Sequence, residues 1–132
     1  LPIGRLNRNL MTYLSAHEGK GECGIRMVWD QQDFRNNWGF LAHVLLPAGV
    51  SIGYHRHDLM EETYVVINGS GRITVDDETE VVYEGAVIPN RIGGSHGIYN
   101  HTQDDLEMLV VAVCLEQGKL DTVDLDDDLT EQ

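Results

Sequence analysis

The chain has 132 residues, the usual size of a single domain with its own core. Nine basic residues against 22 acidic ones give a formal net charge of −13, which argues against binding to nucleic acid phosphates or to an anionic membrane. Two cysteines, Cys23 and Cys114, fall in no metal-binding spacing, and no apolar run approaches the roughly 20 residues of a membrane helix. With no secretion signal at its start, the sequence predicts a cytoplasmic protein.

The two ends of the chain differ from its middle. Residues 1–24 contain scattered Gly and Asn without a sustained hydrophobic period, so we expect a short arm with one helical turn near Met11 to His17. Residues 121–132 carry six acidic side chains and no basic one, which is typical of a solvated or frayed tail. Residues 25–120 form the predicted domain.

The middle of the chain consists of short runs rich in β-branched and aromatic residues, separated by turn signals. Many short strands without a long 3.6-residue period predict an all-β sandwich or barrel. The predicted strands are Gly24 to Trp29, Trp38 to Leu46, Ser51 to His57, Thr63 to Asn68, Arg72 to Asp76, Glu80 to Tyr83, Ala86 to Pro89, Gly94 to Tyr99 and Leu106 to Leu115.

The third predicted strand carries a candidate metal site. His55 and His57 share one face of the strand because side chains alternate, while Arg56 points away. Two imidazoles with a carboxylate five residues further on suit a divalent first-row metal. The segment closes with the turn residues 68–71, Asn-Gly-Ser-Gly, between two runs rich in Val, Ile and Tyr, which predicts a hairpin.

Two sequence patterns resemble the motifs of the cupin superfamily. The first pattern, G(x)5HxH(x)3–4E(x)6G, is met by Gly49, His55, His57, Glu62 and Gly69. The second, G(x)5PxG(x)2H(x)3N, is met by Gly85, Gly93, His96 and Asn100, with Arg91 in place of the proline. The resemblance covers about residues 40 to 115.

This resemblance implies a cupin double-stranded β-helix, a jelly-roll barrel with a short N-terminal arm. It also implies one divalent transition metal, Fe, Mn, Zn or Ni, held by His55, His57, Glu62 and His96. Glu61 is the alternative carboxylate, because the first motif also permits three residues before the glutamate. Glu62 is preferred because it lies seven residues before Gly69.

Tyr64 and Arg91 are the candidate catalytic residues. Tyr64 lies two residues beyond Glu62, so its phenol should face the same interior as a general acid or base. Some cupin lyases that cleave a dimethylsulfonium acid use a tyrosine at the matching position, although a packing role for Tyr64 is the alternative. Arg91 is expected near the barrel mouth, where a guanidinium can hold a substrate carboxylate. A surface arginine paired with a neighbouring acid is the other interpretation.

Other aromatic and polar side chains have weaker claims. His43 is expected to be a satisfied core histidine, with a pocket-facing acid–base role as the alternative. His17 and His101 are not candidate ligands. Trp38 is expected in the core, with substrate stacking as a further possibility, and Asn100 should brace a loop by hydrogen bonds.

The last predicted strand, residues 106–115, is apolar at almost every position, as expected of a strand covered on both faces. A second subunit can supply the outer cover, so we expect a homodimer. The intact ligand set favours a metal-dependent enzyme that acts on a small polar molecule such as an organic acid or sugar derivative. Proton transfer, by an isomerase, epimerase or lyase, and oxygen-dependent oxidation by a dioxygenase both remain open. The alternative is a non-catalytic cupin that binds or senses a small molecule.

Overall fold

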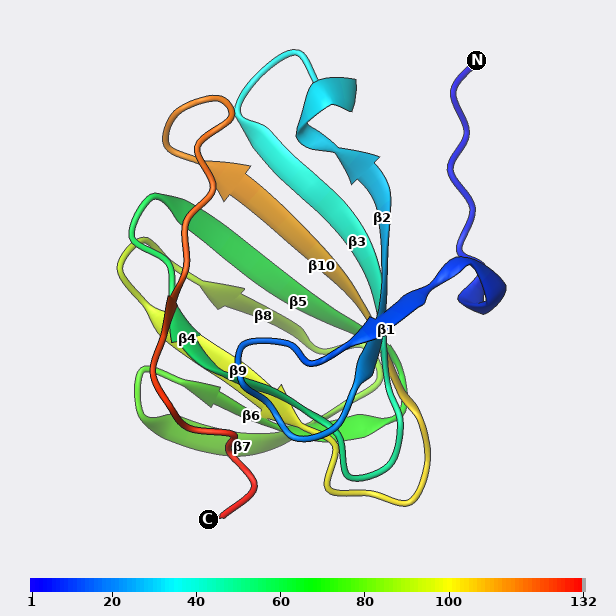
Figure 1. Cartoon of the computed structure of the whole chain (residues 1–132), viewed down its shortest axis with the longest axis vertical. Coiled ribbons are helices and arrows are strands. Elements are labelled where there is room, and N and C mark those ends of the chain that lie inside the picture. The colour runs from blue at the N-terminus through cyan, green and yellow to red at the C-terminus, as the bar shows by residue number, and fades with distance from the viewer. Residues whose placement is uncertain (132) are drawn as a thin grey trace.

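Two antiparallel β-sheets face each other in the computed structural model, which describes residues 1–131 (Figure 1). The larger sheet has the strand order β1-β2-β3-β10-β5-β8, and the smaller one has the order β11-β4-β9-β6-β7. The all-β prediction and the cupin-like jelly roll are confirmed. The strands are β1 Thr12–Leu14, β2 Cys23–Asp30, β3 Trp38–Leu46, β4 Ser51–Arg56, β5 Met60–Asn68, β6 Ser70–Val75, β7 Glu78–Tyr83, β8 Val87–Asn90, β9 Ser95–Tyr99, β10 Leu106–Cys114 and β11 Val123–Asp124.

All nine predicted strands are present, each within a few residues of its expected bounds. Strand β10, which was expected to be covered on both faces, is fully buried on one face only. Its buried positions alternate with half-buried ones from end to end, so Met108 and Val110 enter the core while Leu109 and Val111 face outward. Cys114 ends this strand as a buried small side chain.

The hairpin predicted at residues 68–71 is wrong. Strand β5 pairs with β10 and β8, whereas β6 pairs with β7 and β9, so the chain passes from one sheet to the other at Gly69. Gly69 has a φ of +89°, and a Cβ there would collide with the carbonyl of Asp105. The tight hairpin lies one strand later, where Asp76 and Asp77, both with positive φ, join β6 to β7.

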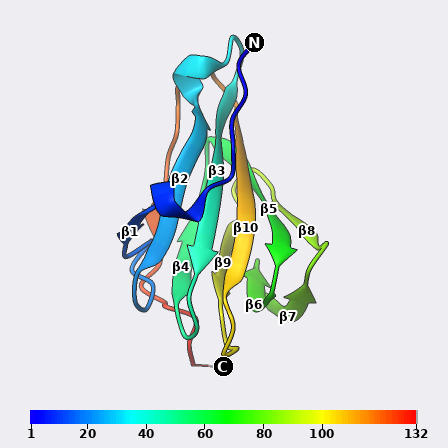
Figure 2. The ribbon, with the colours of Figure 1, turned by 90° about the vertical axis from the view of Figure 1, so that its right-hand side faces the viewer.

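The helical turn predicted near Met11 to His17 is also wrong. The only helical turn of the described N-terminal segment is the short 3-10 helix η1, Arg8–Leu10, and it is followed by β1, which pairs with β2. In the view of Figure 2 the segment before β1 lies in front of β3 and β10, and Arg8 of this segment forms ion pairs with Asp105 and Glu107. A second 3-10 helix, η2, Gln31–Asp33, connects β2 to β3.

The acidic C-terminal segment is not a frayed tail. It returns along β4 (Figure 1), where β11 pairs with residues 55 and 56. The Asp121 carboxylate accepts hydrogen bonds from the backbone N–H groups of Asp58 and Leu59, and the Leu129 side chain is 2% exposed. Charge counting missed these contacts because the acids of this segment point outward or cap backbone amides while Leu129 enters the core.

Candidate metal centre

Three strands bring the histidines and the glutamate of the two motifs together. His55 lies at the end of β4 and pairs in register with His96 of β9, and His57 follows β4 directly. Glu62 points inward from β5 of the opposite sheet. All four side chains are buried, and their candidate ligand atoms lie within 4.8 Å of one another.

The Glu62 carboxylate is the centre of this group. Its Oε1 atom lies 2.9 Å from Nε2 of His96, 3.4 Å from Nε2 of His57 and 3.9 Å from Nε2 of His55. The neighbouring Glu61 is exposed and accepts a hydrogen bond from the backbone N–H of Ile92. The structure therefore places Glu62, and not Glu61, in the potential metal site.

Backbone carbonyls fix the orientation of two of the imidazoles. Nδ1 of His55 donates to the carbonyl of Gly53 at 2.7 Å, and Nδ1 of His57 donates to the carbonyl of Asp121 at 2.6 Å. Because a carbonyl can only accept, the proton of each neutral ring is on Nδ1, and the Nε2 lone pair faces the group. Both Nε2 atoms are buried without a hydrogen-bond partner among residues 1–131. Unpartnered lone pairs beside a carboxylate fit a divalent cation.

The pKa shifts of His55, His96 and Glu62 agree with a site that is ready to bind a cation at neutral pH, whereas the shift of His57 opposes it. Burial lowers the pKa of His55 and of His96, which keeps these two rings neutral. Burial alone would raise the pKa of Glu62, but the three facing imidazoles outweigh it and hold that pKa well below its usual range. For His57, burial lowers the pKa, while Glu62 and the Asp121 carbonyl raise it more, so the net shift is upward.

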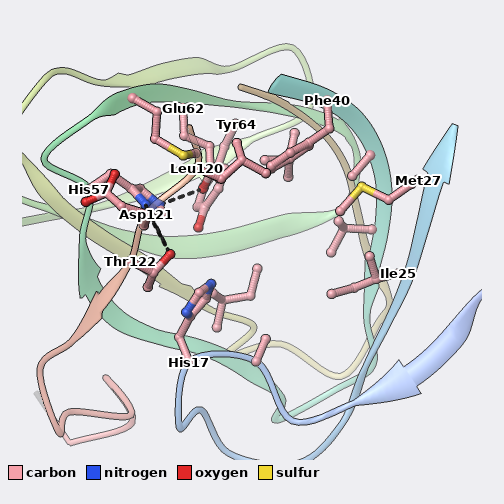
Figure 3. A pocket seen from close by; sticks show the side chains of 16 residues that line it. His17, Ile25, Met27, Phe40, His57, Glu62, Tyr64, Leu120, Asp121 and Thr122 are labelled. Carbon is pink, nitrogen blue, oxygen red and sulfur yellow. Dashed lines mark hydrogen bonds and ion pairs between the residues drawn. The ribbon is translucent and has the colours of Figure 1, made fainter. Parts of the chain in front are cut away.

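A cavity of about 240 Å³ opens beside this group, between the two sheets (Figure 3). His57, Glu62 and Tyr64 line its polar end. As predicted, Tyr64 faces the interior, where it is 1% exposed and stacks on His96 with 4.3 Å between ring centroids. Burial, with the charge of Glu62, raises the pKa of Tyr64 well above its ordinary value, so its phenol stays protonated.

Other predicted residues lie away from the cavity. Arg91 is exposed and does not line it, so the structure does not bring this guanidinium to the site. His43 faces the outer side of the larger sheet, where it bonds to Glu107, so the pocket-facing alternative is wrong. Trp38 packs on Phe34 outside the cavity lining. Asn100 donates to the carbonyls of Leu46 and Asp104 and braces the loops as expected.

Sequence reasoning missed His17. This half-buried side chain lines the cavity and stacks on His55 with 3.7 Å between ring centroids, and its Nδ1 contacts Asp124 at 3.0 Å. Its backbone carbonyl approaches Gly53 so closely that any Cβ there would collide with it. No motif includes His17, and its only local signal is a polar aromatic residue in a segment that otherwise shows no pattern.

The C-terminal segment also contributes to the site, again without a sequence signal. Leu120, Asp121 and Thr122 line the cavity, and the Asp121 carbonyl orients His57. Both end segments therefore complete a site whose core ligands come from the central strands.

A jelly roll with a buried three-histidine, one-glutamate group beside a cavity defines a class of proteins that can hold a metal within a β-sandwich. The cupin domain family matches residues 42–112, more than half of the chain. The chain belongs to the cupin family. Among residues 1–131, no helix has the length and hydrophobicity needed to cross a membrane.

Known proteins and structures agree with this assignment. An oxalate-binding protein of Thermotoga maritima is 31% identical over 97 residues, which cover 74% of this chain and 80% of that protein. A T. maritima structure described as a predicted oxalate decarboxylase is 27% identical, with a TM-score of 0.79 over 86% of this chain and 100% of that chain. A polyketide cyclase of Streptomyces resistomycificus is 22% identical and shares the fold, with a TM-score of 0.70 over 96% of this chain and 90% of that chain.

Proposed function

We propose that this protein is a metal-dependent cupin enzyme that acts on a small oxygen-bearing molecule. The observation that carries the proposal is the buried group of His55, His57, Glu62 and His96, with two unpartnered Nε2 atoms beside a cavity. The reaction is either a proton transfer, as in an isomerase, epimerase or lyase, or an oxygen-dependent oxidation. Fold and ligand set recur with many chemistries, so these two reaction types are separated by experiment.

The chain's own residues would bind and orient the substrate around the metal. His55, His57, Glu62 and His96 would hold an Fe, Mn, Zn or Ni ion, which when bound supplies Lewis-acid polarisation of a substrate oxygen or, for iron, oxygen chemistry. The carbonyls of residues 53 and 121 keep two imidazoles in the ligating orientation. The surrounding wall is mostly apolar.

Tyr64 is the proposed general acid. Its ring is held by stacking on His96, and the side chain lines the cavity beside Glu62. Because its pKa is raised, the phenol keeps its proton at neutral pH and can donate it, or a hydrogen bond, to a substrate oxygen that gains negative charge.

Metal analysis of freshly purified protein tests the proposal. We expect close to one transition-metal ion per chain, and loss of that metal in His57→Ala and His96→Ala with an unchanged β-sheet circular dichroism spectrum. His101→Ala is the matched control, because His101 is exposed and lies outside the group. A protein that holds no metal and takes up none of the four ions on titration would overturn the metal site and the proposed enzyme together.

The identity of the metal and the need for oxygen then separate the two reaction types. An oxidation requires iron and consumes oxygen, whereas a proton transfer should proceed anaerobically with Zn, Mn or Ni. Turnover that persists without oxygen excludes the dioxygenase, and turnover that stops without oxygen excludes the isomerase, epimerase or lyase.

A binding function is the second candidate, and the name of the T. maritima oxalate-binding protein favours it. In that case the metal-loaded chain should bind oxalate and leave it chemically unchanged. Isothermal titration gives the affinity, and chromatography of the recovered ligand shows whether it was converted. Conversion of oxalate supports the enzyme, and stable binding supports the binding module.

A further inference from the structure

The walls of the cavity are much less polar than the end where the histidines and Glu62 lie. Apolar side chains from both sheets form most of the lining, and the lining contains no Lys or Arg. From this division we infer the substrate class: a small molecule with an apolar body, such as one aromatic ring or a branched hydrocarbon, and a single oxygen-bearing end. The inference rests on the proposed function, which places the oxygen-bearing end at the metal group, the cluster formed by His55, His57, Glu62 and His96.

The polar and apolar parts of the lining occupy opposite ends of the cavity. Figure 3 shows His57, Glu62 and Asp121 on one side, and Ile25, Met27 and Phe40 on the other. Further apolar lining comes from Ala42, Val44, Ile52 and Val110. A ligand that ran from one end to the other would therefore meet polar groups at its head only.

The size of the cavity suits such a ligand. An apolar cavity of about 150 Å³ in another protein stays dry and holds benzene, and the cavity here is about 240 Å³. One six-membered ring with a short oxygen-bearing substituent therefore fits between the sheets.

A ligand that carries hydroxyl groups or a carboxylate on its body, away from the oxygen-bearing head, fits the lining poorly. Beyond the four candidate metal ligands, the side-chain hydrogen-bonding groups of the lining are those of His17, Tyr64, Asp121 and Thr122, near the polar end. Hydroxyl groups on the body of a sugar derivative would lose their water and find no partner against Ile25, Phe40 and Val44. A second carboxylate would meet no cation there, because Arg91 lies outside the cavity.

Three hydroxamates test the inference, because they share one metal-chelating head and differ only in the body. Acetohydroxamate has a methyl body, glycerohydroxamate a hydroxylated one, and benzohydroxamate a phenyl ring. Affinities are measured by methyl NMR titration, on both metal-loaded and metal-free protein. We expect benzohydroxamate to bind about tenfold or more tightly than either of the others, because only its body buries a large apolar area.

Variants in the apolar wall place the phenyl group. Met27 is 46% exposed and Ile25 is half-buried, so Met27→Ser and Ile25→Ser should fold. Both variants should lower the affinity for benzohydroxamate several-fold and leave the affinity for acetohydroxamate unchanged. Both should also keep the wild-type metal content. Val87→Ser on β8 is the matched control, since Val87 is 62% exposed and does not line the cavity.

The outcomes separate this inference from the proposed function. Equal affinities of the three compounds, or tighter binding of glycerohydroxamate, in protein that holds its metal would overturn the substrate class and leave the metal site intact. Absence of metal would overturn the proposed function. In that case, a phenyl preference in the metal-free protein that is lost in Ile25→Ser would still support the apolar ligand class, and its absence would overturn it.

Discussion

Asp121 lies at the junction between the C-terminal segment and the metal group. Its carboxylate accepts hydrogen bonds from the backbone N–H groups of Asp58 and Leu59 at 2.8 and 2.9 Å, and its carbonyl accepts from Nδ1 of His57 at 2.6 Å. The Asp121 side chain fixes the backbone of its own residue, and the carbonyl of that backbone orients the His57 imidazole. Asp121→Ala should therefore lower metal affinity although no ligand is changed.

The expected magnitude has two parts. Loss of two charge-assisted hydrogen bonds from a half-buried carboxylate should lower the free energy of unfolding of the metal-free protein by about 2 kcal/mol. Loss of the fixed partner of a metal-ligating histidine typically weakens metal binding by about 10- to 100-fold. Asp121→Asn keeps one carbonyl oxygen as an acceptor, so it should lie between Asp121→Ala and the wild type.

Urea unfolding of metal-free protein measures the first quantity, and competition for Zn²⁺ with a fluorescent chelator measures the second. Glu116→Ala is the matched control, because it removes the same charge from an exposed side chain that pairs only with Lys119 among residues 1–131. If Asp121→Ala binds Zn²⁺ as tightly as Glu116→Ala does, the side chain does not hold the carbonyl and the reasoning fails.

Three further outcomes are expected. Tyr64→Phe should retain its metal and lose about 10²- to 10⁴-fold in turnover, whereas near-wild-type turnover would leave Tyr64 a packing residue. The hydrogen bond from Arg8, opposed by burial and aided by His43, holds the pKa of the Glu107 carboxyl below its ordinary 4.5. The contribution of this carboxylate to the free energy of unfolding is therefore complete above about pH 4.5, and it is lost as the pH falls through the lowered pKa. Urea unfolding should therefore show Glu107→Gln less stable than wild type at pH 6, with the difference shrinking towards pH 3; a constant difference would refute this. Light scattering should give a molecular mass of about twice 14.8 kDa for the wild-type protein, as predicted for a homodimer. Val111→Glu, on the outer face of β10, should give 14.8 kDa. A monomeric mass for the wild-type protein would refute the dimer prediction.

The strands and the metal group could be predicted because their signals are local. The apolar run of residues 106–115 marked a strand, and the spacing of His55, His57 and Glu62 reflects two strands that are consecutive in the chain. The choice of Glu62 over Glu61 rested on its spacing to Gly69, and it agrees with the structure, where only one of these two successive side chains faces inward.

The features that were missed depend on contacts between distant parts of the chain. His17 stacks on His55, and the segment after residue 120 docks on β4, through partners that no local pattern names. The turn at Gly69 was misread because the same Asn-Gly signal serves a hairpin and a crossing between sheets. The pairing partners of β5 and β6 decide between the hairpin and the crossing, and those partners lie elsewhere in the sequence.

The contact between His57 and the carbonyl of Asp121 joins residues 64 positions apart, and that between His17 and Asp124 joins residues 107 positions apart. A ribosome synthesises residues 121–124 after every metal ligand has left the peptidyl transferase centre. The cavity wall and the partner of His57 are therefore completed only after the central strands have been made. A metal held at the proposed site would therefore reach its final geometry only after residues 121–124 have been made.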